Sequence, residues 1–194
     1  MDSGKNNDRQ EKISKKDSEE GPVLINTGEG KGKTTAALGL ALRAAGHNQK
    51  VLIIQFIKGC FETGEFKIIK KLKPLIEIER LGKGFIKFKD GMPVPTRTQV
   101  VNASESFGYA CKKVASGKYD MIILDEIINL IGYGLLRIED TIDLIKNKPK
   151  KLCIVLTGRN APRELVDMAD TVTEMREVKH AFSRGVKAKK GIEY

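Results

Sequence analysis

The chain of 194 residues is 40% apolar and carries a formal charge of +10 at pH 7, which fits one domain with a buried core. Its longest apolar runs fall far short of the roughly 18 residues that span a bilayer. Its first twenty residues lack the apolar segment of a secretory signal, and its three cysteines form no CxxC pair. We therefore expect a cytoplasmic protein without a membrane partner, a disulfide framework or a zinc site.

The start of the chain differs from the rest in composition. Residues 1–20 carry five basic and six acidic side chains, and Ile13 is their one large aliphatic residue after Met1. Such a segment cannot offset its ordering entropy by burial, so we predict a disordered tail over residues 1–21 and a single domain over residues 22–194. The remaining 174 residues carry +11, which favours an anionic partner such as a nucleoside triphosphate or a nucleic acid.

From Val23 onward, short apolar runs alternate with helical stretches, which is typical of an α/β domain with a mostly parallel sheet flanked by helices. The expected strands are Val23–Asn26, Val51–Phe56, Ile76–Leu81, Met121–Asp125, Leu152–Thr157 and Thr171–Met175. The expected helices are Thr34–Ala45, Thr98–Ser116, Ile138–Lys146 and a fourth that begins at Pro162. The stretch Gly82–Pro95 contains three glycines and two prolines, so we predict a long loop there.

A glycine-rich segment lies between the first expected strand and the first expected helix. It reads Gly28-Glu29-Gly30-Lys31-Gly32-Lys33-Thr34-Thr35, and all eight residues are predicted to bind ATP. Glycines let successive backbone N–H groups point at phosphate oxygens, and the following helix adds its positive end. Lys33 would reach the outer phosphates and the Thr34 hydroxyl would bind Mg²⁺. The segment predicts a P-loop NTPase of RecA-like architecture, although the first glycine comes one residue later than in the usual pattern.

Two carboxylates follow a strand that is expected to be buried. Asp125 and Glu126 end the run Met121-Ile-Ile-Leu. Burying carboxylates is costly unless they face a cation or a hydrogen-bond donor. Beside a phosphate loop, they are predicted to complete a Mg²⁺ site with Thr34, one of them directly and the other through water.

Several longer segments resemble one family. After the phosphate loop come Leu-Gly-Leu-Ala-Leu-Arg-Ala-Ala-Gly-His47 and Val-Leu-Ile-Ile-Gln-Phe-Ile-Lys-Gly59, and the chain ends in Val-Lys-His-Ala-Phe-Ser-Arg-Gly-Val-Lys-Ala-Lys-Lys-Gly-Ile-Glu-Tyr194. These segments resemble the P-loop corrinoid adenosyltransferases. The resemblance implies transfer of the 5′-deoxyadenosyl group of Mg-ATP to the Co(I) of cob(I)alamin or an earlier corrinoid, with inorganic triphosphate as the leaving group.

The resemblance also implies roles for individual residues. Lys33 and Phe85 would be catalytic, because Lys33 binds the leaving triphosphate and Phe85 displaces the lower ligand of cobalt. Arg43 would approach the ribose side of ATP. Arg159 follows a strand end, where ligands bind in open α/β sheets, and is expected to contact a phosphate. The sequence departs from the family where Lys87 replaces a tryptophan and Glu29 replaces a small amide.

The implied partners are ATP, a corrinoid, an electron-donating reductase and a second copy of the chain in a homodimer. We do not expect nucleic acid to be a partner. Three other readings of the phosphate loop stay open at this point. A nucleic-acid-dependent ATPase is favoured by the basic charge, a nucleotide switch of the partitioning type would carry a lysine where Gly28 stands, and a small-molecule kinase would release ADP.

Overall fold

Six strands form one parallel sheet in the computed structural model, which describes residues 20–57, 63–82 and 86–192. The strand order is β3-β2-β6-β7-β1-β8, and each neighbouring pair runs parallel. The bounds are β1 (Val23–Thr27), β2 (Val51–Gln55), β3 (Ile76–Arg80), β6 (Met121–Asp125), β7 (Cys153–Thr157) and β8 (Thr171–Glu174). All carboxyl ends therefore meet at one edge of the sheet.

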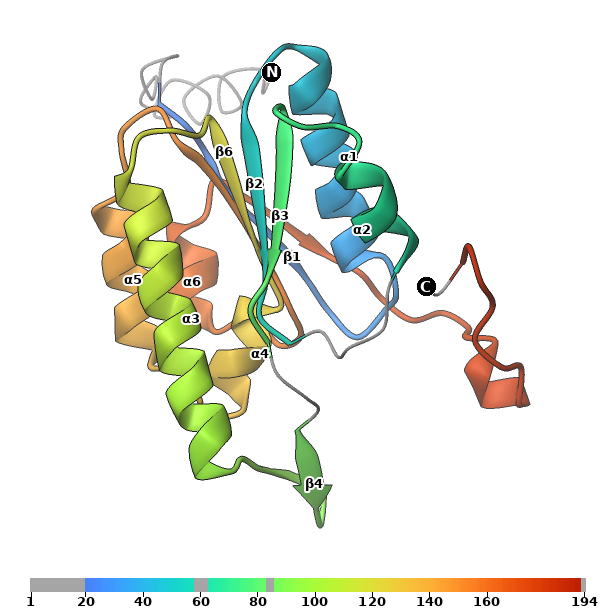
Figure 1. The fold of residues 1–194 in the computed structure, drawn as a ribbon. Helices are drawn as coiled ribbons and strands as arrows, with labels where there is room; N and C mark the ends of the chain where they lie inside the picture. The colour runs from blue at the N-terminus through green and yellow to red at the C-terminus, as the bar shows by residue number, and fades with distance from the viewer. Residues whose placement is uncertain (1–19, 58–62, 83–85, 193–194) are drawn as a thin grey trace, which may run out of the picture.

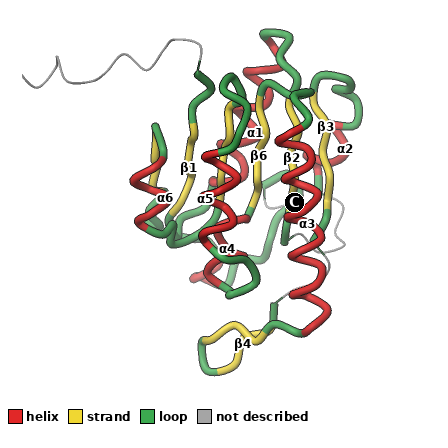
Figure 2. The backbone as a smooth tube through the Cα atoms, turned by 90° about the vertical axis from the view of Figure 1, so that its left-hand side faces the viewer, coloured by secondary structure: helices red, strands yellow, loops and turns green. Residues whose placement is uncertain are grey.

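Helices cover both faces of this sheet (Figures 1 and 2). One face carries α1 (Lys33–Gly46) and α2 (Gly64–Ile69). The other carries α3 (Arg97–Ala115), α4 (Ile127–Gly132), α5 (Ile138–Lys146) and α6 (Arg163–Met168). A 3-10 turn, η1 (Phe182–Arg184), lies in the C-terminal segment, which extends away from the sheet in Figure 1.

The sheet is apolar on both faces because both are covered, as is usual for parallel sheets. Along β2, Leu52 and Ile54 pack into the cluster shared with α3 to α6, whereas Val51 and Ile53 pack into the cluster shared with α1. This alternation explains why the run from Val51 to Ile54 contains no polar residue.

Helix α1 contacts the sheet through small side chains. Ala37, Ala41 and Ala44 recur at helical spacing, are 1%, 1% and 6% exposed, and belong to the same core cluster as Val51 and Ile53. Alanine projects only a methyl group, so the backbone of α1 lies close to the sheet. Helix α1 begins within the glycine-rich segment. The distance between the helix and the sheet therefore fixes the position of that segment.

The expected α/β fold is confirmed. All six expected strands are present, and so are the four expected helices, with strand ends and the three complete helix ranges placed within one residue. The two short helices α2 and α4 were not expected. Each has six residues, which is less than two helical turns and too short for a clear period of apolar residues.

The prediction of a long loop over Gly82–Pro95 is wrong in part. Within it, β4 (Lys87–Lys89) and β5 (Met92–Val94) form an antiparallel hairpin that projects from the domain (Figure 1). Asp90 and Gly91 connect the two strands and both have positive φ angles, 52° and 77°. An Asp-Gly pair favours the two-residue turns that join twisted strands, and this local preference outweighed the prolines.

The tail predicted for residues 1–21 falls almost wholly outside the described residues, as does Phe85. Gly21 is described, and its N–H donates to the backbone oxygen of Lys150 at 2.9 Å. Among the described helices, none combines the length and the apolar character that crossing a membrane would require.

Helix α3 begins with a capping box, which offers a test of the fold. The Thr96 hydroxyl accepts from the backbone N–H of Gln99, and the Gln99 side chain accepts from the backbone N–H of Thr96 at 2.8 Å. We expect Thr96→Ala to lower the free energy of unfolding by about 1 kcal/mol in urea denaturation. The matched control is Thr98→Ala, an exposed threonine in the same turn, which we expect to stay within about 0.5 kcal/mol. Equal losses would contradict the role of the cap.

Candidate functional site: a nucleotide-binding site at the carboxyl edge of the sheet

The glycine-rich segment forms a tight loop between β1 and α1. Gly28 and Gly32 have φ angles of 94° and 117°, which other residues adopt only with strain. A Cβ atom at Gly28 or Gly30 would lie 2.5 or 2.6 Å from the backbone oxygen of Met175. The chain after β8 thus runs directly against the loop, and the two glycines are the residues that permit this approach.

Backbone hydrogen bonds hold Met175 in that place. Its N–H donates to the backbone oxygen of Thr27 at 2.8 Å, and its oxygen accepts from the N–H of Gly30 at 2.6 Å. Strand β1 and its neighbour at the edge of the sheet, β8, therefore continue their contact into the loop.

The Lys33 side chain folds over the same loop. Its Nζ donates to the backbone oxygens of Gly28 at 2.5 Å and Gly30 at 2.7 Å. Partial burial lowers the pKa of Lys33, and the positive charge of Arg159 lowers it further, while Glu29 and Glu126 act in the opposite direction. The loop therefore holds the positive charge of Lys33 in a partly buried place beside the positive charge of Arg159. Such a place suits an anionic ligand.

Beneath the loop, one register row of the sheet is polar on every strand. Gln55 pairs with Arg80 and with Asp125 on its two sides, and Asn26 pairs with Thr157. Their neighbours one position earlier are apolar on β1, β2, β6 and β7. Buried polar groups are costly unless they are hydrogen-bonded. We call these residues the polar row: Arg80, Gln55, Asp125, Thr157, Asn26 and Thr173.

Asp125 is the centre of the polar row. It is fully buried, and its Oδ1 accepts from the hydroxyls of Thr34 at 2.9 Å and Thr157 at 2.7 Å. Its Oδ2 accepts from the amide nitrogen of Gln55 at 3.1 Å. The first turn of α1 and three adjacent strands are thus joined at one carboxylate.

Glu126 leaves the sheet at the next position. Its backbone is left-handed, with φ 67° and ψ 16°, and it is the N-cap of α4. Its N–H donates to the Thr157 hydroxyl at 2.8 Å. This sharp turn brings the Glu126 side chain to the wall of the adjoining cavity, while Asp125 stays below it.

The loop opens on a cavity of about 570 Å³, within the range of sites that hold small molecules. Four other parts of the chain complete its wall: the start of α2, the start of α4, the turn after β7 and the C-terminal segment. The Lys31 ammonium donates to the backbone oxygen of Ile192 at 3.0 Å, which ties that last segment to the loop. From these parts come Gly64, Glu65, Asn129, Gly158, Arg159, Glu177, His180, Gly191 and Ile192.

Most residues that the sequence singled out come together here. The residues from Glu29 to Thr35 line the cavity, and so do Glu126 and Arg159. The backbone oxygen of Gly28 accepts a hydrogen bond from Lys33 within the loop. Asp125 accepts a hydrogen bond from the Thr34 hydroxyl. Arg159 forms an ion pair with Glu29 at 3.1 Å across the mouth of the loop. Arg43 lies instead in the last turn of α1, exposed and away from the cavity wall.

Other residues of the site were missed. Gln55 and Thr157 join Asp125, and Asn129 accepts the backbone N–H of Arg159 at 2.7 Å. A signal was present for Gln55, since it is the one polar residue in the apolar run from Val51 to Ile57. No comparable signal marked Asn129, which depends on a helix that the sequence did not predict.

The donor set fits a magnesium ion bound together with phosphates. Mg²⁺ is usually held in proteins by one or two carboxylates, with phosphate oxygens and waters as the other ligands. The Thr34 hydroxyl and the Asp125 carboxylate meet at 2.9 Å, and Glu126 lines the same cavity. Among the described residues, no group of three or more His, Cys, Asp or Glu side chains is placed so that it could hold a metal ion.

The fold and the site together define a P-loop nucleotide-binding protein: a glycine-rich loop with its lysine and threonine lies above a buried aspartate on a central parallel strand. A solved structure supports the fold. The KaiC-like protein from Pyrococcus horikoshii OT3 superposes with a TM-score of 0.50 at 16% sequence identity, over 84% of this chain and 76% of that one.

Sequence comparison identifies the family. The family described as ATP:corrinoid adenosyltransferase BtuR/CobO/CobP matches residues 19–194. The corrinoid adenosyltransferase of Escherichia coli strain K12 is 36% identical over 94% of this chain and 90% of its own length. The corresponding enzyme of Pseudomonas aeruginosa is 35% identical over 95% of this chain and 89% of its own. The chain belongs to the corrinoid adenosyltransferase family and is a transferase.

Thr157 offers a test of the polar row. Its hydroxyl both donates to Asp125 and accepts from the N–H of Glu126, so Thr157→Val would remove two buried hydrogen bonds while keeping the shape of the side chain. We expect a loss of about 1–3 kcal/mol in the free energy of unfolding, measured by chemical denaturation. In the same row, the exposed Thr173 on β8 provides the control, and Thr173→Val should change stability by less than about 0.5 kcal/mol. A neutral Thr157→Val would show that these hydrogen bonds contribute little.

Proposed function

We propose that the cavity binds Mg-ATP and that the enzyme transfers the 5′-deoxyadenosyl group of ATP to the Co(I) of a corrinoid. Co(I) attacks C5′, a cobalt–carbon bond forms, and the C5′–O bond breaks with its electron pair leaving on inorganic triphosphate. Cobalt is thereby oxidised formally from Co(I) to Co(III). The match to the ATP:corrinoid adenosyltransferases over residues 19–194 is the observation that carries this proposal.

A phosphate loop suits this reaction because negative charge grows on the triphosphate as it leaves. Lys33 is proposed to exchange the backbone oxygens of Gly28 and Gly30 for triphosphate oxygens, since its ammonium group already donates to two oxygens at the phosphate loop. Arg159 is proposed to release Glu29 and contact the same anion. Donors held near charge that develops in the transition state accelerate a reaction more than donors that bind the ground state alone.

Magnesium binding is proposed for Thr34, Asp125 and Glu126. When bound, Mg²⁺ would neutralise part of the triphosphate charge. Two donors of the polar row, Gln55 and Thr157, hold Asp125 in a fixed orientation, and the Thr34 hydroxyl of α1 donates to the same carboxylate. Glu126, on the cavity wall, is proposed to reach the ion through water.

Further elements of the proposal lie beyond the described site. Phe85 is proposed to contact the corrin and displace the lower ligand of cobalt, and Arg43 to approach the ribose of ATP. We also propose a homodimer, a cytoplasmic location and an electron-donating reductase that supplies Co(I). Light scattering tests the dimer, because a monomeric mass would end that part of the proposal.

The proposed reaction can be tested directly. Under anaerobic conditions, the protein is mixed with Mg-ATP and chemically reduced cob(I)alamin, and the corrinoid spectrum is followed while triphosphate is assayed. We expect adenosylcobalamin and triphosphate in equal amounts. Lys33→Ala should lower kcat/KM by at least about 100-fold, whereas the distant and exposed Lys118→Ala should not. Release of ADP, or hydrolysis stimulated by nucleic acid, would instead support a kinase or a motor ATPase.

The metal site predicts a separate change in binding. In calorimetric titrations, Mg²⁺ should raise the affinity of the wild-type protein for ATP. We expect Asp125→Asn to reduce this Mg²⁺-dependent gain in affinity by about 10- to 100-fold. Asp143→Asn changes an exposed carboxylate on α5 and should leave the titration unchanged. An unchanged titration for Asp125→Asn would place the ion elsewhere.

A further inference from the structure

Two members of the polar row, Gln55 and Arg80, have no role in the proposed chemistry, yet both are tied to Asp125. Gln55 is 0% exposed at the end of β2 and lies between Arg80 of β3 and Asp125 of β6 in the sheet register. We propose that Arg80 is a positioning residue: it orients the Gln55 amide, and through it the carboxylate that serves the metal site. The inference rests on the proposed Mg-ATP site.

The Gln55 amide has a defined direction. Its nitrogen donates to Oδ2 of Asp125 at 3.1 Å, and its oxygen accepts from Nε of Arg80 at 3.2 Å. A flipped amide would place oxygen against the carboxylate and NH₂ against the guanidinium, which are two repulsive contacts. An arginine side chain carries hydrogen-bond donors and no acceptor. Arg80 is therefore compatible with only one of the two orientations of the Gln55 amide.

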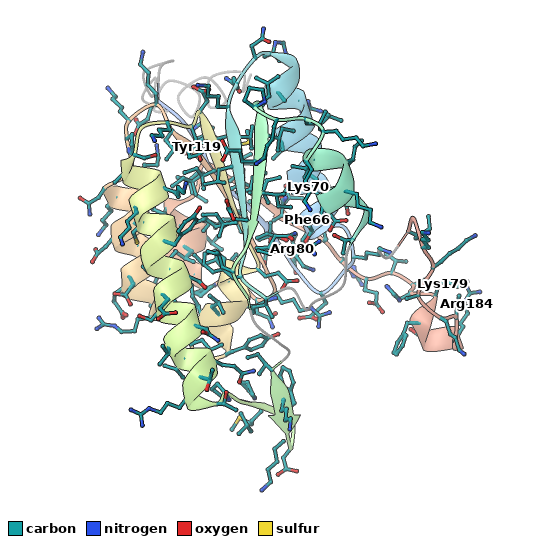
Figure 3. All side chains as sticks on the ribbon, in the orientation of Figure 1. Phe66, Lys70, Arg80, Tyr119, Lys179 and Arg184 are labelled. Carbon is teal, nitrogen blue, oxygen red and sulfur yellow. The ribbon has the colours of Figure 1, made fainter. Side chains whose placement is uncertain are left out.

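Arg80 is itself held from the other side. Its terminal nitrogen donates to the Thr63 hydroxyl at 2.5 Å, and its guanidinium carbon lies 4.0 Å from the centre of the Phe66 ring. Figure 3 labels Arg80 and Phe66 where β3 faces α2. A planar guanidinium can stack on a ring and donate in its own plane at the same time, which a lysine cannot do.

These contacts connect two parts of the nucleotide cavity. Thr63 is the N-cap residue of α2, and the next two residues, Gly64 and Glu65, line the cavity. On its other side the chain of contacts runs through Gln55 to Asp125 and on to the Thr34 hydroxyl. Arg80 therefore couples the α2 wall of the cavity to the carboxylate beneath the phosphate loop.

The structure supplies a matched control. Lys70 also lies over Phe66, with its ammonium 4.2 Å from the ring centre, but it is exposed and is not a member of the polar row. Arg80→Met and Lys70→Met each remove one positive charge and one cation from the same ring, and both keep an unbranched side chain. Only Arg80→Met removes the hydrogen bond to Gln55.

The experiment measures ATP binding by calorimetry with Mg²⁺ and again in EDTA, so that it does not depend on turnover. We expect Arg80→Met to weaken Mg-ATP binding about tenfold, equivalent to about 1.4 kcal/mol, while Mg-free ATP binding changes less than about twofold. Lys70→Met should change neither by more than about twofold. If Arg80→Met and Lys70→Met behave alike, or if binding with and without Mg²⁺ falls equally, the proposal is wrong.

A double-mutant cycle tests whether Arg80 acts through Gln55. Gln55→Met keeps the length of the side chain and removes both of its hydrogen bonds. We expect the double variant to bind Mg-ATP no more weakly than Gln55→Met alone, since the path is already broken; additive losses would overturn the proposed path. Circular dichroism and thermal unfolding check each variant, and the comparison of Arg80 with Lys70 stands if Gln55→Met does not fold.

The outcomes also separate this inference from the proposed site. Failure of the wild-type protein to bind Mg-ATP, or an unchanged Mg²⁺ dependence in Asp125→Asn, would refute the site itself and the inference with it. A wild-type site that responds to Asp125→Asn but not to Arg80→Met would refute the inference alone.

Discussion

The site depends on keeping one carboxylate buried and directed. Asp125 has no exposure to solvent, and its side chain accepts from Thr34, Thr157 and Gln55. Without such donors, a buried carboxylate would cost several kcal/mol or take up a proton. Each donor comes from a different element, so the same contacts that stabilise the charge also fix α1, β2 and β7 relative to β6.

The parallel sheet makes this arrangement possible. Parallel strands bring their carboxyl ends to one edge, and the register places the polar residues of neighbouring strands side by side. The apolar rows beneath them form the core, while the polar row joins the sheet to the first turn of α1 through Asp125. The loops and the C-terminal segment form the rest of the cavity wall above this row.

The sequence alone predicted the sheet and the phosphate loop well, because both depend on local patterns. Apolar runs of three to five residues marked most of the buried strands, and glycines with a lysine and a threonine marked the loop. It failed where the structure depends on contacts distant in sequence. The approach of Met175 to Gly30, the path from Arg80 to Asp125 and the position of Asn129 follow from strand register and from a short helix, which composition does not reveal. Arg43 lies in the last turn of α1, and its role near the ribose stays a prediction.

The alanine face of α1 has a consequence for how such a chain can diverge. Three methyl groups, those of Ala37, Ala41 and Ala44, set the separation between the helix and the sheet, and the Thr34 hydroxyl is carried on the first turn of that helix. A bulkier side chain at any of them would lift the helix and stretch the 2.9 Å contact with Asp125, although none of the three touches the cavity. Positions remote from the cavity thus act as spacers for the site, and their tolerance to substitution depends on side-chain volume rather than on polarity.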